Sequence, residues 1–137
     1  MRARHARPTT LAAALSAMLA AHASAAILRV DASLATGANN GSSWADAFQG
    51  RLGLVAAIAA ALPGDEIWLA DGAYAPAPPG GPRSATFFLP PNITILGGFS
   101  GGEASADQRD PALHPAVLTG DLNSNDGPPS NGLPVNA

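Results

Sequence analysis

"PGDEIWLADGAY", residues 63–74, places a short apolar strand between two turns. Its turn dipeptides, Pro-Gly and Asp-Gly, are typical of sharp changes in chain direction. Between them the apolar pattern has a period of two, so Ile67 and Leu69 share one face of the strand and Trp68 lies on the other. A strand of about five residues is not stable alone, so its partner strands must lie elsewhere in the chain.

Candidate partner strands recur along the sequence at a regular spacing. Ile67, Ile93 and Val117 mark three apolar segments, separated by 26 and 24 residues. Short strands that return every 20–30 residues without long helices between them are typical of a solenoid. The spacing therefore predicts an all-β solenoid of about three rungs. A small β-sandwich with irregular strands is the alternative.

A helix is expected before this stretch, over residues 44–62. Ser43 and Asp46 have the spacing of a capping box, and the Pro-Gly pair after residue 62 ends the run. Apolar residues at steps of three and four form one stripe, namely Trp44, Phe48, Leu52, Val55, Ala59 and Leu62. An earlier apolar segment, residues 27–30, is expected to be the first strand.

The N-terminal residues 1–25 have the pattern of a signal peptide. Three arginines precede the apolar run "LAAALSAMLAA", and Ala23 and Ala25 form an A-x-A cleavage pattern before Ala26. The apolar run is shorter than the roughly 18–20 residues that a membrane span needs. We therefore expect an exported protein, extracellular or on the cell surface, whose mature chain is residues 26–137 and has no transmembrane segment.

The composition of residues 26–137 restricts the partners of the protein. Four arginines and ten acidic residues give this part a net charge of −6, and lysine is absent. An acidic chain without a basic cluster disfavours nucleic acids and anionic membranes as partners. Cysteine is also absent, so stability must come from core packing, a metal or a larger context.

Four motifs together resemble a known family. "NNGSSWADAF" (39–48), "PGDEIWLADGAY" (63–74), "GGFSGGE" (97–103) and "QRDP" (108–111) follow one another in this order. The chain resembles the N-terminal part of bacterial secreted right-handed parallel β-helix proteins of the pectin-lyase-like fold, of the choice-of-anchor surface-protein type. The resemblance implies a capping helix at the open end of the solenoid. It also implies further rungs of the parent chain, so the sequence is interpreted as a truncated fragment.

Carboxylates near the central strand are candidates for glycan chemistry. Asp65, Glu66 and Asp71 flank residues 66–70, and paired acids can serve as general acid and base or bind calcium in a lyase. Asp is also favoured at turns because it hydrogen-bonds to the backbone, and we prefer this structural interpretation. No catalytic residue and no cofactor site is therefore assigned to them.

The segment "DLNSNDG" (121–127) is the metal candidate. Its side chains could supply oxygen ligands to calcium from Asp121, Asn123, Asn125 and Asp126. The glycine comes one place late for an EF-hand loop and no glutamate closes it. Turns contain the same residue types, so this interpretation is preferred to calcium binding, and the tail over 121–137 is expected to be irregular.

Other residues carry weaker signals. His114 stands before a proline in a polar loop, and Arg109 could bind a substrate or contact Asp107 or Asp110 locally. Trp68 and Phe88 could form a sugar-stacking face if both point outward, but packing under a loop is preferred.

Two classes of function follow from these patterns. The first is a non-catalytic structural module, or one that binds carbohydrate or other cell-surface components, in an exported protein. The second is the N-terminal part of a polysaccharide lyase or glycoside hydrolase whose active rungs lie beyond this chain. The first is preferred because no catalytic constellation stands out, and an enzyme is not assigned.

Overall fold

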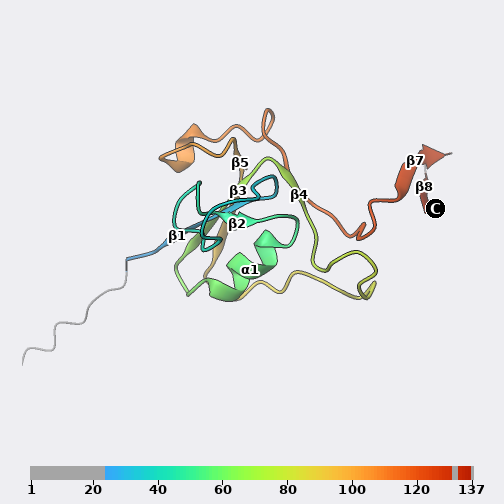
Figure 1. The fold of residues 1–137 in the computed structure, drawn as a ribbon, viewed down its shortest axis with the longest axis horizontal. Helices are drawn as coiled ribbons and strands as arrows, with labels where there is room; N and C mark the ends of the chain where they lie inside the picture. Colours follow the sequence, from blue (N-terminus) through green and yellow to red (C-terminus); the bar gives the residue numbers. More distant parts are fainter. Residues whose placement is uncertain (1–23, 131–132, 137) are drawn as a thin grey trace, which may run out of the picture.

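The computed structural model describes residues 24–130 and 133–136, and for 126–130 and 133–136 it describes the backbone alone. The predicted signal peptide, residues 1–25, lies almost wholly outside the described residues. Within these residues the chain forms three small sheets, one α-helix and one 3-10 helix (Figure 1).

The largest sheet has four parallel strands in the order β2-β1-β3-β5. Its strands are β1 (Ile27–Asp31), β2 (Phe48–Gln49), β3 (Glu66–Ala70) and β5 (Thr94–Phe99). A second, two-stranded parallel sheet pairs β4 (Gly72–Tyr74) with β6 (Ala116–Leu118). A third pairs β7 (Asp126–Ser130) with β8 (Leu133–Asn136) in antiparallel fashion.

Strand β3 lies at the centre because it is apolar on both faces. Ile67 and Leu69 are buried in the main core together with Val30 and Leu54. Trp68, on the opposite face, is also buried and stacks on Phe99. Parallel strands covered on both faces have such nearly continuous apolar runs. The strand and the alternation expected from "EIWLA" are confirmed.

The helix α1 (Gly53–Ala60) is shorter than expected and buries a different face. It contacts β1, β2 and β3 through Leu54, Ala57 and Ile58, and Figure 1 shows it against this side of the sheet. Val55, which the expected stripe placed inward, is 39% exposed. The stripe failed because its first members are not helical: Phe48 belongs to β2.

The expected fold, a right-handed parallel β-helix of about three rungs with a capping helix over 44–62, is wrong. The described residues form a four-stranded parallel sheet, a two-stranded parallel sheet, a hairpin, the short α-helix and a 3-10 turn. The segment that contains Val117 was expected to stack on the segment that contains Ile93. Instead, Val117 pairs with Ala73 of β4. The even spacing therefore matched strand pairing in its first interval only: β3 pairs in parallel with β5, whereas β6 pairs with β4 in a separate sheet, so the three segments do not stack into one solenoid.

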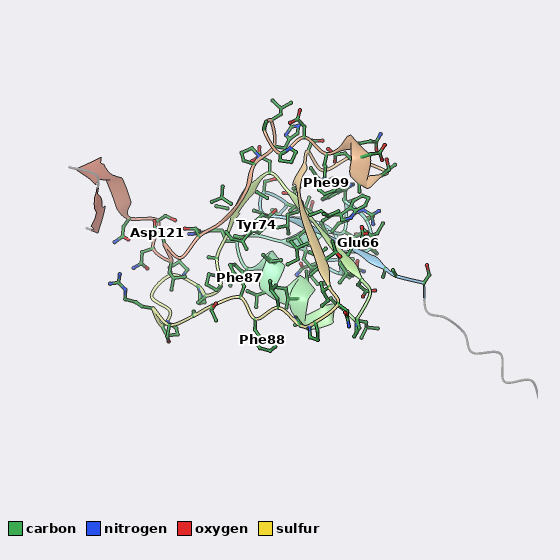
Figure 2. The ribbon with its side chains drawn as sticks, turned by 180° about the vertical axis from the view of Figure 1, so that it is seen from behind. Glu66, Tyr74, Phe87, Phe88, Phe99 and Asp121 are labelled. Atoms are coloured by element: carbon green, nitrogen blue, oxygen red, sulfur yellow. The ribbon has the colours of Figure 1, made fainter. Side chains whose placement is uncertain are left out.

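Two further segments differ from expectation. Phe88, for which packing under a loop was preferred, is instead 79% exposed, and it lies in a segment, residues 85–90, that forms no strand. Figure 2 shows Phe88 pointing away from the body of the molecule, whereas Phe87 packs against the core. In the tail, expected to be irregular over 121–137, the structure has the β7–β8 hairpin.

Candidate functional site

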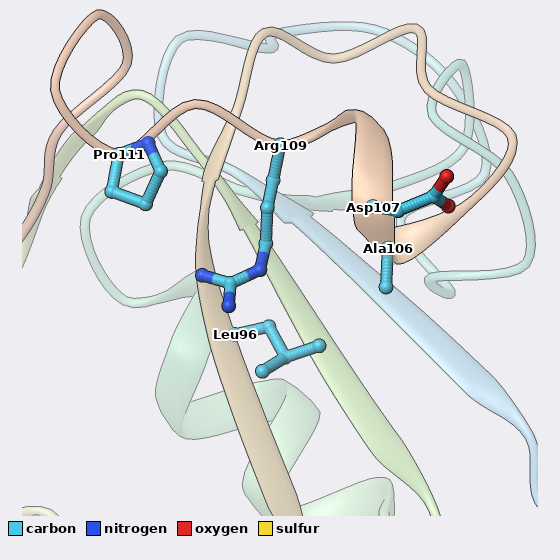
Figure 3. Close-up of a pocket in the computed structure, with 5 residues that line it drawn as sticks. All are labelled: Leu96, Ala106, Asp107, Arg109 and Pro111. Atoms are coloured by element: carbon cyan, nitrogen blue, oxygen red, sulfur yellow. The ribbon is translucent and has the colours of Figure 1, made fainter.

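An open cleft of about 480 Å³ lies over β5. It is lined by Leu96, Ala106, Asp107, Arg109 and Pro111 (Figure 3). Leu96 comes from β5, and the other four come from the 3-10 helix η1 (Ala106–Gln108) and the residues that follow it. The cleft therefore combines an apolar strand residue with one cation and one carboxylate on a neighbouring loop.

The guanidinium of Arg109 is the chief polar group of the cleft. Figure 3 shows its side chain extended over β5 toward Leu96. One terminal nitrogen donates to the carbonyl oxygen of Gly97 at 3.4 Å, which is a long hydrogen bond. In the described part of the chain, Arg109 forms no ion pair with a carboxylate. Because a guanidinium has five N–H donors, most of its hydrogen-bonding capacity is available to a ligand.

Backbone contacts hold the segment after η1 against the edge of β5. The amide of Asp110 donates to the carbonyl oxygen of Gly98 at 2.7 Å. Gly98 has φ +102°, and a Cβ atom there would lie 2.7 Å from the nitrogen of Pro111. Glycine is therefore needed at this position both for the backbone conformation and for the close approach.

The loop before η1 is ordered by one carboxylate. Glu103 accepts hydrogen bonds from the amide and hydroxyl of Ser100 and from the amides of Gly101 and Gly102. Desolvation raises the pKa of Glu103, but the hydrogen bonds from Ser100 and Gly102 outweigh it, and the pKa is lowered to about 2. The "SGGE" part of "GGFSGGE" is therefore a structural turn that positions η1.

An aromatic cluster borders the same face of the sheet. Trp44 and Trp68 both lie against Phe99, with ring centroids 5.6 Å and 4.6 Å away. The guanidinium of Arg29 lies 6.0 Å from the ring of Trp44 and 5.5 Å from that of Trp68, within the range of cation–π attraction. Because Trp68 is 2% exposed, it forms no common sugar-stacking face with the exposed Phe88.

The carboxylates around β3 have separate structural partners. Asp65 is buried and accepts hydrogen bonds from the amides of Ala26 and Leu62, both at 2.8 Å. Glu66 accepts from the indole nitrogen of Trp68 at 2.8 Å, and Asp71 is exposed. The structure thus gives Asp65 the backbone-bonding role that the turn interpretation predicted. No catalytic pairing of the three is seen among the described residues.

The proposed calcium segment is attached to two other loops. The amide oxygen of Asn123 accepts from the amide of Gly80 at 2.8 Å, and a carboxylate oxygen of Asp121 accepts from the amide of Asn125 at 3.3 Å. Arg51 donates to the carbonyl oxygen of Asp121 at 2.8 Å, so a positive charge already lies beside the segment.

Asp126 begins β7, and its side chain lies outside the described atoms. Within the described residues, no group of three or more His, Cys, Asp or Glu side chains could hold a metal ion. Calcium binding at 121–126 stays a prediction without further structural support.

His114 and the "RDP" motif form a turn. The carboxylate of Asp110 accepts from the amides of Ala112 and Leu113 at 3.1 Å, and its carbonyl oxygen accepts from the amide of His114 at 2.8 Å. Asp110 therefore orders the turn after Arg109. The Arg109 side chain, for which a local contact with Asp107 or Asp110 was one expectation, instead contacts the carbonyl oxygen of Gly97.

Another hollow lies between α1 and the residues before β5. It has a volume of about 420 Å³ and a mainly apolar lining that includes Val55, Ile58, Phe87 and Phe88. With no charged group to orient a ligand, it offers less chemical selectivity than the cleft over β5.

Several residues that order the loops and the aromatic cluster described above were not identified from the sequence. Arg51 and Glu103 act through contacts with backbone groups, and Arg29 acts through contacts with aromatic rings. Only the "SGGE" spacing carries a local signal, because a carboxylate after two glycines can accept hydrogen bonds from successive amides. The contacts of Arg29 and Arg51 depend on residues far along the chain.

Comparison of the chain with protein-family models, with curated proteins and with solved structures finds no match. Among the described residues, no helix has the length and apolar character that crossing a bilayer requires.

Proposed function

We propose that this protein is a non-catalytic surface-interaction module of an exported protein and that it binds carbohydrate in the cleft over β5. The observation that supports this most directly is the guanidinium of Arg109, which lies over an apolar strand residue without a carboxylate partner in the described chain. Export is supported by the signal-peptide pattern of residues 1–25.

Sugars present apolar C–H faces and hydroxyl groups that both donate and accept hydrogen bonds. Leu96 and Pro111 supply apolar surface and the guanidinium of Arg109 supplies donors, whereas the carboxylate of Asp107 points away from Arg109 and Leu96 (Figure 3). The cleft is open, which suits a site within a chain of sugars as well as a chain end.

Binding can be tested by isothermal titration of the exported product with a panel of neutral and acidic oligosaccharides. Arg109→Ala should weaken binding at least tenfold, because the donors of the guanidinium are lost. Arg83→Ala is the matched control, since Arg83 is exposed in another loop. Equal affinity in both variants, or no binding to any sugar of the panel, would refute the proposal. Release of new sugar ends during the titration would instead favour the hydrolase or lyase alternative.

A further inference from the structure

Ala26 is held by the protein at both of its backbone polar groups. Its nitrogen lies 2.8 Å from the carboxylate oxygen Oδ1 of Asp65, and its carbonyl oxygen accepts a hydrogen bond from the amide of Glu66 at 2.9 Å. These contacts fix the residue immediately before β1, although residues 24–26 are themselves exposed. The position of this backbone nitrogen is thus determined by β3 and the turn before it.

The partner of this nitrogen is unusual within the described chain. Asp65 is 8% exposed, and it is the one buried polar or charged residue among the described residues. Its other oxygen, Oδ2, accepts from the amide of Leu62 at 2.8 Å. The hydrogen bonds from Leu62 and Ala26 lower the pKa of Asp65, so the carboxylate is charged. An ammonium group at the position of the Ala26 amide would interact with this carboxylate more strongly than a neutral amide does.

The sequence offers such a group at the same atom. The A-x-A pattern at Ala23 and Ala25 places signal-peptidase cleavage between Ala25 and Ala26. In this hydrolysis the oxygen of water is added to the carbonyl carbon of Ala25, which leaves as a carboxylate. The nitrogen of Ala26 takes up protons and becomes an α-ammonium group.

We propose that Asp65 is the receptor for the mature N-terminus, and that processing converts the Ala26–Asp65 hydrogen bond into an ion pair. This inference rests on the export part of the proposed function and is independent of carbohydrate binding. A charge-assisted hydrogen bond is stronger than a neutral one, so the processed chain is held more firmly at the start of β1 than the precursor. Signal removal thereby contributes to the stability of the folded product.

The ion pair makes the stability of the product depend on pH. An α-amino group has an ordinary pKa of about 8, and a neighbouring carboxylate raises it. A group whose pKa is raised by folding stabilises the protein below its unfolded pKa, and this stability is lost as the pH rises through the folded value. Glu66, which contacts Trp68, and Arg29 on β1 are the other charged groups close by. The negative charge of Glu66 raises the pKa of the α-amino group, as that of Asp65 does, and the positive charge of Arg29 lowers it.

The absence of lysine makes this pKa directly measurable, because the α-amine is the only primary amine in the chain. The full chain with its own signal is expressed in an exporting bacterial host, and the intact mass of the product identifies its first residue. The product is then treated briefly with an amine-acylating reagent between pH 6 and pH 11, folded and in urea, and the labelled fraction is read by mass spectrometry. The rate profile against pH gives the pKa of the α-amine.

We expect a product that begins at Ala26 and a pKa about one unit higher in the folded protein than in urea. In Asp65→Asn the folded and urea values should agree within a few tenths of a unit, whereas Asp71→Asn, at the exposed other end of β3, should keep the difference. If Asp65→Asn does not fold, the difference between the α-amine pKa of folded wild-type protein and its value in urea still tests the ion pair.

Each of the remaining outcomes overturns the inference in a distinguishable way. A product that begins at Ala26 with equal folded and urea pKa values overturns the ion pair and leaves export intact. A product that begins at another residue overturns the receptor role, and a chain that is not exported overturns the export proposal as well. Carbohydrate binding by Arg109 is measured separately and is unaffected by any of these results.

Discussion

The ring of Trp68 stacks on the ring of Phe99 with centroids 4.6 Å apart and planes 8° apart. The two residues come from neighbouring strands, β3 and β5, and both are almost fully buried. The stack therefore links the centre of the sheet to the strand that carries the candidate cleft. Stacked aromatic pairs contribute about 0.5–1.5 kcal/mol beyond the area that they bury.

Phe99→Ala should destabilise the protein by about 3–5 kcal/mol, because it removes a buried ring and its stacking contact with Trp68. Phe88→Ala is the matched control, since the same atoms are removed from a side chain that is 79% exposed. The control should change stability by less than about 0.5 kcal/mol. Urea denaturation followed by tryptophan fluorescence measures both values. Similar losses in the two variants would contradict the packing described for Phe99.

Arg51 joins the end of β2 to a segment about seventy residues later. It donates to the carbonyl oxygen of Asp121 at 2.8 Å and to the hydroxyl of Ser124 at 2.6 Å. Arg51→Ala should therefore release residues 119–125 and increase their amide hydrogen exchange several-fold, because local opening becomes easier. Exchange measured by mass spectrometry should show no comparable change in Arg83→Ala. Unchanged exchange over 119–125 in Arg51→Ala would show that the loop is held by other contacts.

The sequence predicted local elements better than their pairing. "EIWLA" was placed correctly because alternation and flanking turns are local signals, and β3 matches residues 66–70. The stripe over 44–62 failed because Trp44 and Phe48 have helical spacing by coincidence. Trp44 packs on Phe99, and Phe48 lies in β2, where it pairs with Val30 of β1. A left-handed glycine, Gly50 at φ +70°, separates these residues from the helix.

The candidate site was only partly visible in the sequence. Arg109 was identified as a substrate-binding candidate, but its position over Leu96 depends on the hydrogen bond between Asp110 and Gly98. Similarly, Asp65 was correctly interpreted as a backbone acceptor, whereas its contact with Ala26 spans 39 residues. Contacts over such separations are decided by tertiary packing, which single-sequence patterns do not contain.

The carboxylate of Glu103 should make the free energy of unfolding depend on pH in the acidic range. Its pKa is lowered to about 2 from an ordinary value of 4.5 by hydrogen bonds that outweigh desolvation. A lowered pKa means that the stabilisation is complete above the unfolded pKa and is lost as the pH falls through the folded value. Wild-type protein should thus lose stability between about pH 4.5 and pH 2, and Glu103→Gln should lose less over this range.

Urea midpoints measured at pH 2, 3, 4.5 and 7 test this prediction. At pH 7 Glu103→Gln should be less stable than wild type, and the difference should shrink toward pH 2 because Glu103 becomes protonated as the pH approaches its folded pKa. Asp71→Asn serves as the control for loss of an exposed carboxylate. A constant difference between Glu103→Gln and wild type across the four pH values would contradict the assignment.

Gly98 decides how closely the Arg109 segment approaches β5. Its φ of +102° is strained for any other residue, and a Cβ atom would lie 2.7–2.9 Å from three atoms of Pro111. Gly98→Ala should therefore destabilise the protein by about 1–3 kcal/mol and displace Arg109 from Leu96, so that carbohydrate affinity falls together with stability.

Gly120→Ala is the matched control, because no atom lies within 4 Å of a Cβ atom built there. It should be neutral within about 0.5 kcal/mol and leave binding unchanged. Urea denaturation and the oligosaccharide titration, carried out on both variants, measure the two effects side by side. If Gly98→Ala lost stability but bound sugar with wild-type affinity, Arg109 would not be positioned through the contact between Gly98 and Pro111.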